Sequence, residues 1–168
     1  MNIIFFEDNR NQFLQLVYTK PLAKIRVGIL TIEDKWKQHF LKHSVTITTS
    51  YVSEDYLSKK FPLKEAQENI FINARFFPNE RLVDFIINNM INDEAILFGE
   101  SVVASKCTLE QFKTESYSVK EFNESVISIE LKSVTDIFSK NDVAIQDDFD
   151  LITVGRKSAE LSNTNILI

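Results

Sequence analysis

The sequence predicts an α/β fold built on a largely parallel sheet, in a single domain. Apolar segments of strand length alternate along the chain with amphipathic segments of helical period, which is the pattern of β–α–β units. The 168 residues, of which 44% are hydrophobic and 26% charged, suffice for one domain with its own core and argue against disorder. The order of the strands in the sheet does not follow from this pattern.

Strands and helices alternate in the first half of the chain. Apolar and β-branched runs predict strands at residues 2–6, 45–49 and 69–73, and an extended segment at residues 13–18. Thr31 is a suitable N-cap for a helix whose apolar face consists of Ile32, Trp36, Phe40 and Leu41. Residues 53–61 predict a short helix that is capped by Ser53 and ends before Pro62.

The strongest helical pattern lies at residues 78–90. Asn79 is a suitable cap there, and the apolar face consists of Leu82, Val83, Ile86, Ile87 and Met90. Residues 95–98 and 101–105 predict a hairpin, and the mostly polar residues 107–125 carry no assignment. The remaining pattern predicts a strand at 126–131, the start of a helix at 134–138, and a helix at 142–154 with Ile145, Phe149 and Ile152 on one side.

Charge and composition exclude several classes of protein. The net charge of −5 and the pI of about 5.1 argue against a nucleic-acid partner or an anionic membrane surface. No stretch reaches the roughly 20 apolar residues of a membrane span, and residues 1–6 lack the basic start and the length of a signal peptide. The single cysteine, Cys107, cannot form an internal disulfide, which fits a reducing compartment. We therefore expect a cytoplasmic protein.

The carboxyl ends of the first and third predicted strands are the places to look for a ligand, because open α/β sheets bind ligands there. Residues 7–10 follow the first strand, and residues 73–75 follow "NIFI". The segment from Phe6 to Ile29 holds four cations: Arg10, Lys20, Lys24 and Arg26. Phosphate binding and ordinary surface charge both explain them. With only three glycines, the chain has few places for a glycine-rich phosphate loop.

Other residue patterns favour structural explanations. His39 and His43 are four residues apart, but no carboxylate motif surrounds them, and Cys107 has no histidine or basic neighbour. The acidic run "DDFD" at residues 147–150 reads as a solvated helix face, because its carboxylates point in different directions. We therefore expect no metal site from these residues. Phe76 and Phe77 could contact a base or a sugar, but a place in the core is the simpler expectation.

Four segments resemble a known family: "TKPLAKIRVGILTIEDKW" (19–36), "SYVSEDYLSKKFP" (50–62), "NIFINARFFPNERLVDFI" (69–86) and "DFDLITVGRKSAELSNTNILI" (148–168). They resemble the N-terminal sugar-nucleotidyltransferase-like domain of a Bacteroidetes family related to bifunctional UDP-N-acetylglucosamine pyrophosphorylase/glucosamine-1-phosphate acetyltransferase. The resemblance implies a three-layer α/β/α, Rossmann-like domain with a mostly parallel mixed sheet. It also implies a transferase of cell-envelope biosynthesis that takes a nucleoside triphosphate, or a nucleotide sugar, and a sugar phosphate, with Mg²⁺ as the cofactor.

The resemblance further implies that a left-handed β-helix domain follows residues 1–168. The apolar end "NILI" would then be a point of truncation, and the missing domain could carry an oligomeric contact.

The family's phosphate-binding pattern is only partly present. "FEDNRNQF" replaces the usual glycine loop, so Arg10 stands for the loop arginine, and Leu22 follows Pro21 where a lysine is usual. Arg26 matches the "IRVGI" of the sub-family, and Lys20 is a further candidate for the missing charge. "INAR" stands where "NGD" is usual, which makes Asn73 and Arg75 candidate ligand contacts. Arg75 then replaces the metal-binding aspartate, and Asp8 is a weaker candidate to replace that ligand.

Three functions follow from these residues. The first is nucleotidyl transfer from a nucleoside triphosphate to a sugar 1-phosphate, with Arg10 and Arg26 as catalytic cations. The second is a degenerate module that binds a nucleotide sugar without turnover, which the missing glycines, lysine and aspartate favour. The third is a structural module that serves an acyltransferase domain.

Overall fold

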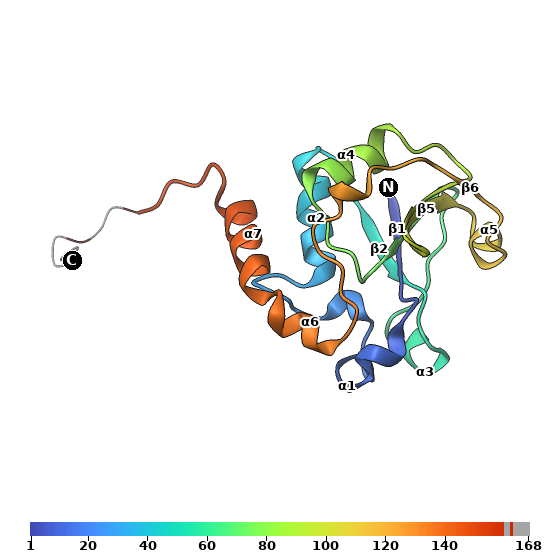
Figure 1. Cartoon of the computed structure of the whole chain (residues 1–168), viewed down its shortest axis with the longest axis horizontal. Coiled ribbons are helices and arrows are strands. Elements are labelled where there is room, and N and C mark those ends of the chain that lie inside the picture. The colour runs from blue at the N-terminus through green and yellow to red at the C-terminus, as the bar shows by residue number, and fades with distance from the viewer. Residues whose placement is uncertain (160–161, 163–168) are drawn as a thin grey trace.

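One six-stranded mixed sheet forms the centre of the protein (Figure 1). The structure is a computed structural model, and it describes residues 1–159 and 162. The strands lie in the order β2-β1-β3-β5-β4-β6. Their bounds are β1 Asn2–Phe6, β2 Thr48–Tyr51, β3 Asn69–Asn73, β4 Glu94–Phe98, β5 Ser101–Cys107 and β6 Ser118–Val119.

The sheet is mostly parallel, as predicted. β1 pairs in parallel with β2 on one side and with β3 on the other, and β4 pairs in parallel with β6. β5 is antiparallel to both β3 and β4, and β4 and β5 form the predicted hairpin. Because β1 and β3 are central, both of their faces are covered, and all five residues of β3 are buried.

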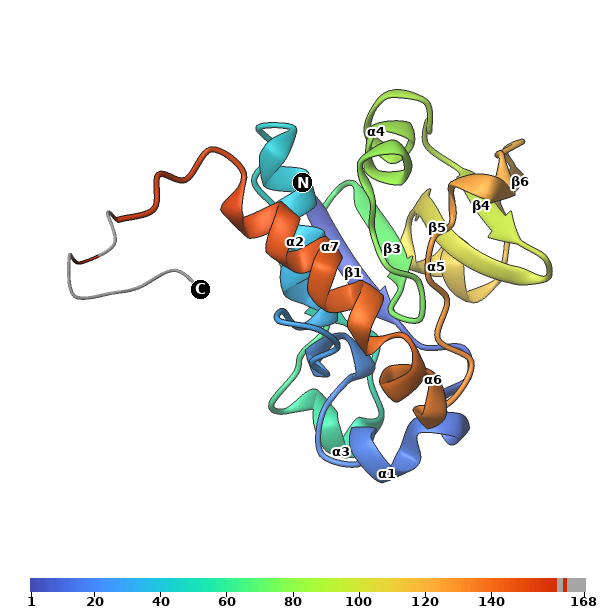
Figure 2. The ribbon, with the colours of Figure 1, turned by 60° about the vertical axis from the view of Figure 1, so that its left-hand side comes forward.

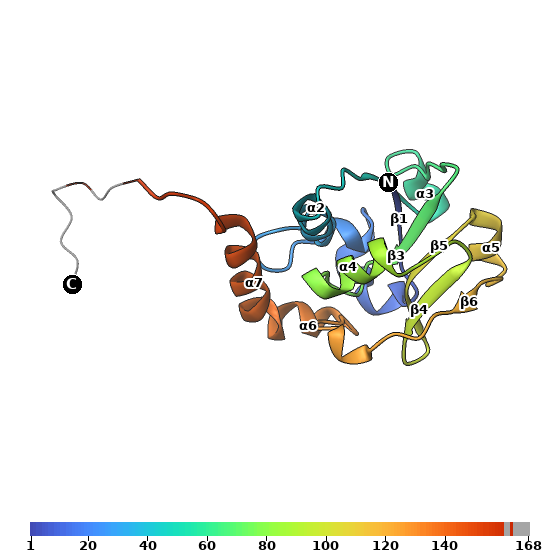
Figure 3. The ribbon, with the colours of Figure 1, turned by 90° about the horizontal axis from the view of Figure 1, so that it is seen from above.

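Helices cover the two faces of the sheet unequally. Their bounds are α1 Leu14–Val17, α2 Ile32–Lys42, α3 Asp55–Ser58, α4 Glu80–Asn88, α5 Leu109–Lys113, α6 Val134–Ser139 and α7 Asn141–Thr153, with short 3-10 turns at Arg10–Phe13, Leu22–Lys24 and Glu124–Val126. The longer helices α2 and α4 lie on one side of the sheet, and α5 lies on the other (Figure 3). α7 packs against the outer side of α2 (Figure 2). The expected three-layer arrangement is thus confirmed, with one thick and one thin outer layer.

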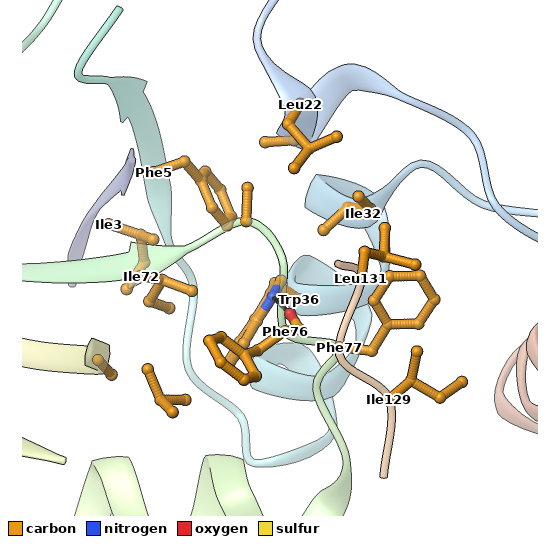
Figure 4. Close-up of a cluster of buried hydrophobic side chains, with 14 of the residues drawn as sticks. Ile3, Phe5, Leu22, Ile32, Trp36, Ile72, Phe76, Phe77, Ile129 and Leu131 are labelled. Atoms are coloured by element: carbon orange, nitrogen blue, oxygen red, sulfur yellow. Dashed lines mark hydrogen bonds between the residues drawn. The ribbon is translucent and has the colours of Figure 1, made fainter. Parts of the chain in front are cut away.

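The main core lies between the sheet and α2. Trp36 is fully buried at its centre, and its indole Nε1 donates a hydrogen bond to the carbonyl of Phe76 at 3.2 Å (Figure 4). Phe76 and Phe77 are buried in this core, which confirms the prediction that they are core residues. The smaller cluster on the opposite face has Ile4, Phe6, Phe71 and Cys107 as its buried members.

Local sequence signals place several elements correctly. β1 and β3 have the predicted bounds, Thr31 caps α2 by accepting from Asp34 N, and Asn79 caps α4 by accepting from Leu82 N. Leu41 is the exception on α2, because its side chain is 59% exposed rather than on the buried face.

Three strand or helix assignments in the first half of the chain were wrong. Residues 13–18 are helical rather than extended, because the buried Phe13 and Val17 are spaced by one helical turn while Leu14 is exposed. The predicted strand at 45–49 begins only at Thr48, where pairing with Asn2 sets the register. The helix expected at 53–61 shrinks to α3, and Ser53 does not cap it but donates to Phe61 O at 3.1 Å.

The segment 126–131 does not join the sheet. It pairs instead with the chain that leaves β3: Phe77 N donates to Ile129 O at 3.0 Å, and Leu131 N donates to Arg75 O at 2.8 Å. Ile129 and Leu131 are buried, so the alternating pattern reports burial against this loop rather than membership of the sheet.

The buried side of α7 is not the side that carries its large apolar residues. Ile145 and Phe149 are 43% and 53% exposed, whereas Ala144 and Asp148 are buried. A Cβ at Gly28 would lie 2.6 Å from Asp148 Oδ2 and 2.7 Å from Ala144 O. The loop at Gly28 therefore packs so closely against α7 that it has no room for a side chain. The expectation that Asp148 is solvated was therefore wrong. The apolar end at Ile166–Ile168 lies outside the described residues.

Candidate functional site at the carboxyl ends of β1 and β3

The strand order creates a topological switch point at β1. From β1 the chain crosses through α2 to β2 on one side, and it then returns to β3 on the other side. Parallel sheets bind ligands in the crevice that such a reversal opens at the carboxyl ends of the strands. Residues 7–10 follow β1, residues 52–55 follow β2, and residues 74–75 follow β3 at this edge.

A hollow of about 330 Å³ lies at the ends of β1 and β2. It is lined by Glu7, Arg10, Val52, Ser53, Glu54 and Asp55. A larger hollow of about 610 Å³ lies beside α4, between Asn79 and Ser128. The residues that line the larger hollow lie outside the segments directly after β1, β2 and β3, which are residues 7–10, 52–55 and 74–75, so we take the smaller hollow as the candidate ligand site.

Arg10 is fixed in the wall of this hollow. Its Nη1 lies 2.8 Å from Glu7 Oε2, and its Nη2 donates to Tyr56 Oη at 3.0 Å and to the carbonyl of Val17. The side chain is 13% exposed. Burial raises the pKa of Glu7, although a hydrogen bond from Leu22 N and the charge of Arg10 act in the opposite direction. Arg10 is thus a rigid cation with part of its charge already met by Glu7.

Arg75 reaches back across the end of β1. Its Nε lies 2.6 Å from Asp8 Oδ1, an ion pair in which the N–H is not aligned with the oxygen. Its Nη2 donates to Asp8 Oδ2 at 3.2 Å and to Ser101 Oγ at 2.8 Å, and it lies 3.4 Å from Glu130 Oε1. The side chain is only 6% exposed. The structure therefore brings Asp8 and Arg75 together at the switch point.

The other candidate residues lie in different settings. Asn73 is fully buried: its Nδ2 donates to Val102 O at 3.0 Å, and its Oδ1 accepts from Arg75 N at 3.1 Å. Arg26 is exposed and Lys20 is half-buried, and within the described residues neither has an ion-pair partner. Lys24 is engaged elsewhere, 2.6 Å from Glu33 Oε2. Arg26 and Lys20 are therefore the cations that remain available.

Sequence patterns missed two partners of Arg75. Ser101 is the first residue of β5, and Glu130 belongs to the segment that pairs with the loop after β3. Neither has a local motif, because both come close to Arg75 only through long-range pairing. A buried basic residue at a strand end requires a carboxylate nearby, but the local sequence does not identify that carboxylate.

The sequence was compared with known proteins. The sugar nucleotidyl transferase family model matches residues 3–157. The chain belongs to this family. No match to the chain was found among curated proteins. The matched range contains β1 to β3, the Arg10 hollow and the Arg75 cluster, so the membership covers the candidate site as well as the fold.

Mg²⁺, which the resemblance implies, does not fit the residues at the end of β3. Two carboxylates, Asp8 and Glu130, are near enough, but the guanidinium of Arg75 stands between them. Within residues 1–159 and 162, no group of three or more His, Cys, Asp or Glu side chains is arranged to hold a metal ion. In the same residues, no helix combines the length and the hydropathy needed to span a bilayer.

Proposed function

We propose that this domain transfers a nucleotidyl group from a nucleoside triphosphate to a sugar 1-phosphate and releases pyrophosphate. The observation that carries the proposal is the hollow at the topological switch point, with Arg10 fixed in its wall, in a member of the sugar nucleotidyl transferase family. A hollow of about 330 Å³ is in the range of small-ligand sites.

The chemistry requires positive charge beside the reacting phosphates. An oxygen of the sugar phosphate attacks the α-phosphorus of the triphosphate, and the bond from that phosphorus to the bridging oxygen breaks as pyrophosphate leaves. Charge that develops on the phosphate oxygens is stabilised by fixed cations and N–H donors. Arg10 offers a fixed guanidinium, and Arg26 and Lys20 offer charges that carry no ion pair within the described residues. Asp8 and Arg75 complete the binding site in this proposal, and the buried Asn73 contributes to it by holding the backbone of Arg75.

The substrate is the finer part of the proposal. The family resemblance supports UTP and an amino-sugar 1-phosphate as substrates, with UDP-N-acetylglucosamine as the product, in cytoplasmic synthesis of cell-envelope precursors. The acidic side chains of Glu54 and Asp55 at the hollow suit hydroxyl and amide donors of a sugar or ribose, because carboxylates only accept hydrogen bonds. A following β-helix domain, and oligomerisation through it, also belong to this proposal.

A specific observation favours a second candidate, a module that binds a nucleotide sugar without turnover. Both arginines at the strand ends are engaged by carboxylates, Arg10 by Glu7 and Arg75 by Asp8. Their charges are then less available to a developing phosphate charge than those of unpaired arginines. Such a module would report on a nucleotide sugar, or position it, for an associated domain.

Pyrophosphate release and ligand binding, measured on the same protein, separate the two candidates. We expect the wild-type chain to release pyrophosphate from UTP and N-acetylglucosamine 1-phosphate. Arg26→Ala should lower kcat/KM by about 10²-fold or more, since one charge contact to a transition state is worth that much. Arg81→Ala, an exposed change on α4, is the matched control. Arg10→Ala should act likewise, with its fold checked by circular dichroism because Arg10 also holds Tyr56.

The outcomes are distinct. Pyrophosphate release that Arg26→Ala leaves unchanged would overturn the role of Arg26. Binding of UDP-N-acetylglucosamine without pyrophosphate release would establish the second candidate. A chain that releases no pyrophosphate, and that binds neither UDP-N-acetylglucosamine nor any triphosphate, would overturn both.

A further inference from the structure

The guanidinium of Arg75 occupies a position that is built like a cation site. Its Nη2 is surrounded by three side-chain oxygens, at 2.8 Å from Ser101 Oγ, 3.2 Å from Asp8 Oδ2 and 3.4 Å from Glu130 Oε1. Hard divalent cations are bound by oxygen atoms of this kind, at about 2.0–2.1 Å for Mg²⁺. A contraction of about 1 Å on each side would convert this nitrogen's surroundings into a metal's coordination shell.

These oxygens converge from separate elements on one point of the sheet. Asp8 follows β1, Ser101 begins β5, and Glu130 lies on the segment that bridges to Phe76. The backbone of Arg75 is held as well, since its N–H donates to Asn73 Oδ1 and its carbonyl accepts from Leu131 N. The charged group therefore sits at the switch point itself and is not a mobile surface arginine.

The charges of this cluster are balanced without a metal. Asp8 and Glu130 carry the negative charges, and Arg75 provides a positive one beside both of them. Lys132 adds a second positive charge, with its Nζ 3.5 Å from Glu130 Oε2. The guanidinium is covalently part of the chain, so this cation cannot dissociate from the site as Mg²⁺ can.

One nitrogen of Arg75 is left over. Nη1 has no hydrogen-bond partner within the described residues, and 6% of the Arg75 side chain is exposed to solvent. An arginine fork held by carboxylates on one edge can still offer its other edge to a phosphate oxygen.

We infer that Arg75 is the permanent cation of this site, in the place that a divalent metal would otherwise take, and that the domain binds its phosphorylated ligand through Nη1 without Mg²⁺. The part that concerns the ligand rests on the proposed function. The part that concerns the cation rests only on the oxygen atoms around Nη2.

Metal binding to an arginine-free variant tests the cation part. Arg75→Gln leaves Lys132, beside Glu130, as the cation of the cluster and none between Asp8 and Glu130, and Arg75→Asp adds a third carboxylate. Titration with Mn²⁺, followed by its electron paramagnetic resonance signal, should show binding to both variants that is at least about tenfold tighter than binding to the wild-type chain. Arg81→Gln, at an exposed position of α4, should match the wild type, and Asp8→Asn added to Arg75→Gln should remove the gain.

Variants that fold, by circular dichroism, but bind Mn²⁺ no tighter than the wild type would overturn the inference. So would a wild-type chain that binds Mn²⁺ as tightly as Arg75→Asp, or a gain that survives the Asp8→Asn change.

Ligand binding by the wild-type chain tests the other part. Calorimetry with UDP-N-acetylglucosamine and with UTP should give a Kd in EDTA within about twofold of the Kd in excess Mg²⁺, because the site's own cation is always present. Arg75→Gln should weaken that binding in EDTA, and Mg²⁺ should restore part of it. Ligand binding that is lost in EDTA would overturn metal independence. Binding of neither compound would overturn the proposed ligand, while the Mn²⁺ titration would still decide the role of Arg75.

Discussion

Glu33, in the first turn of α2, is a buried carboxylate whose charge is held by several neighbours. Its side chain is 1% exposed and lies 2.6 Å from Lys24 Nζ, and it also accepts from Lys37, from Tyr51 Oη and from Thr49 Oγ1. Burial alone would raise its pKa, but these hydrogen bonds outweigh burial and lower the pKa of Glu33 to about 2. The residue therefore links α2, β2 and the turn before α2 through one charge.

We predict that this charge makes the stability of the fold dependent on acid pH. Because the folded pKa lies below the ordinary value of 4.5, the stabilisation is complete above that pH and is lost as the pH falls toward 2. Glu33→Gln should lower the free energy of unfolding at neutral pH by about 1–3 kcal/mol, less than the full shift implies because Lys24 and Lys37 are partly exposed. Urea unfolding measures it, with the exposed Glu65→Gln as control. A Glu33→Gln deficit that stays constant between pH 4.5 and pH 2 would contradict the assignment.

Local pattern in the sequence predicted the ends of β1 and β3, and four candidate residues lie at or shortly after these ends: Asp8, Arg10, Asn73 and Arg75. Their contact with a ligand stays a prediction. The pairing of Arg75 with Glu130 could not be read in this way, because it depends on how the segment after the last 3-10 turn returns to β3. Lone residues that meet through tertiary packing leave no spacing signal in the chain.

At the scale of elements, α7 is attached to the body by a polar contact. Asp148 Oδ2 accepts from Ile29 N at 2.8 Å and from Leu30 N at 2.9 Å, and its Oδ1 lies 2.5 Å from Lys35 Nζ. Asn141, at the start of α7, accepts from Gly28 N at 2.7 Å. The loop that carries Arg26 is thus shaped by a helix from the far end of the chain.

We predict that Asp148→Ala destabilises the fold by about 3–5 kcal/mol, because it removes the ion-pair partner of the buried Lys35 ammonium. Lys35→Met should cost less, since the two backbone N–H groups still satisfy Asp148. A double-mutant cycle should give a coupling energy above about 1 kcal/mol between the two side chains. Asp150→Ala, on the exposed side of the same helix, should change the unfolding free energy by less than about 0.5 kcal/mol. Additive effects of the two changes would show that the ion pair does not join the elements.

The contact between α7 and the loop at Gly28 also explains why the buried side of α7 was predicted wrongly. Helical period correctly predicted a helix, and Ile145, Phe149 and Ile152 do share one side of it. The hydrophobicity of these residues predicted that this side is buried. The structure instead buries the side with the small Ala144 and with Asp148, because α7 comes very close to Gly28 there. Periodicity reports which residues share a face, and the partner surface decides which face is buried.

At the scale of the whole molecule, the two faces of the sheet are covered to very different depths. α2 and α4 bury a large continuous core on one face (Figure 4). On the other face α5 has no buried residue of its own. It is attached mainly by Phe112, whose ring stacks on that of Phe71 with 4.1 Å between the ring centroids. β6, at the edge of the sheet, has only exposed residues. The central strands β1 and β3, which carry the candidate site, are the best-buried elements.

We predict that this asymmetry appears as two levels of hydrogen-exchange protection. Amides of β1 and β3 should exchange only through global unfolding, while those of α5 and β6 should exchange through a local opening of lower free energy. Phe112→Ala should lower the opening free energy of α5 and β6 more than that of β1 and β3. Phe138→Ala, which removes a ring that is 75% exposed, should affect neither region. A single opening free energy for all these amides would contradict the prediction. In that case the stability of the candidate site would depend on the whole fold. The predicted result would instead show that β1 and β3, which Asp8 and Arg75 directly follow or lie near, are the most stable part of the molecule.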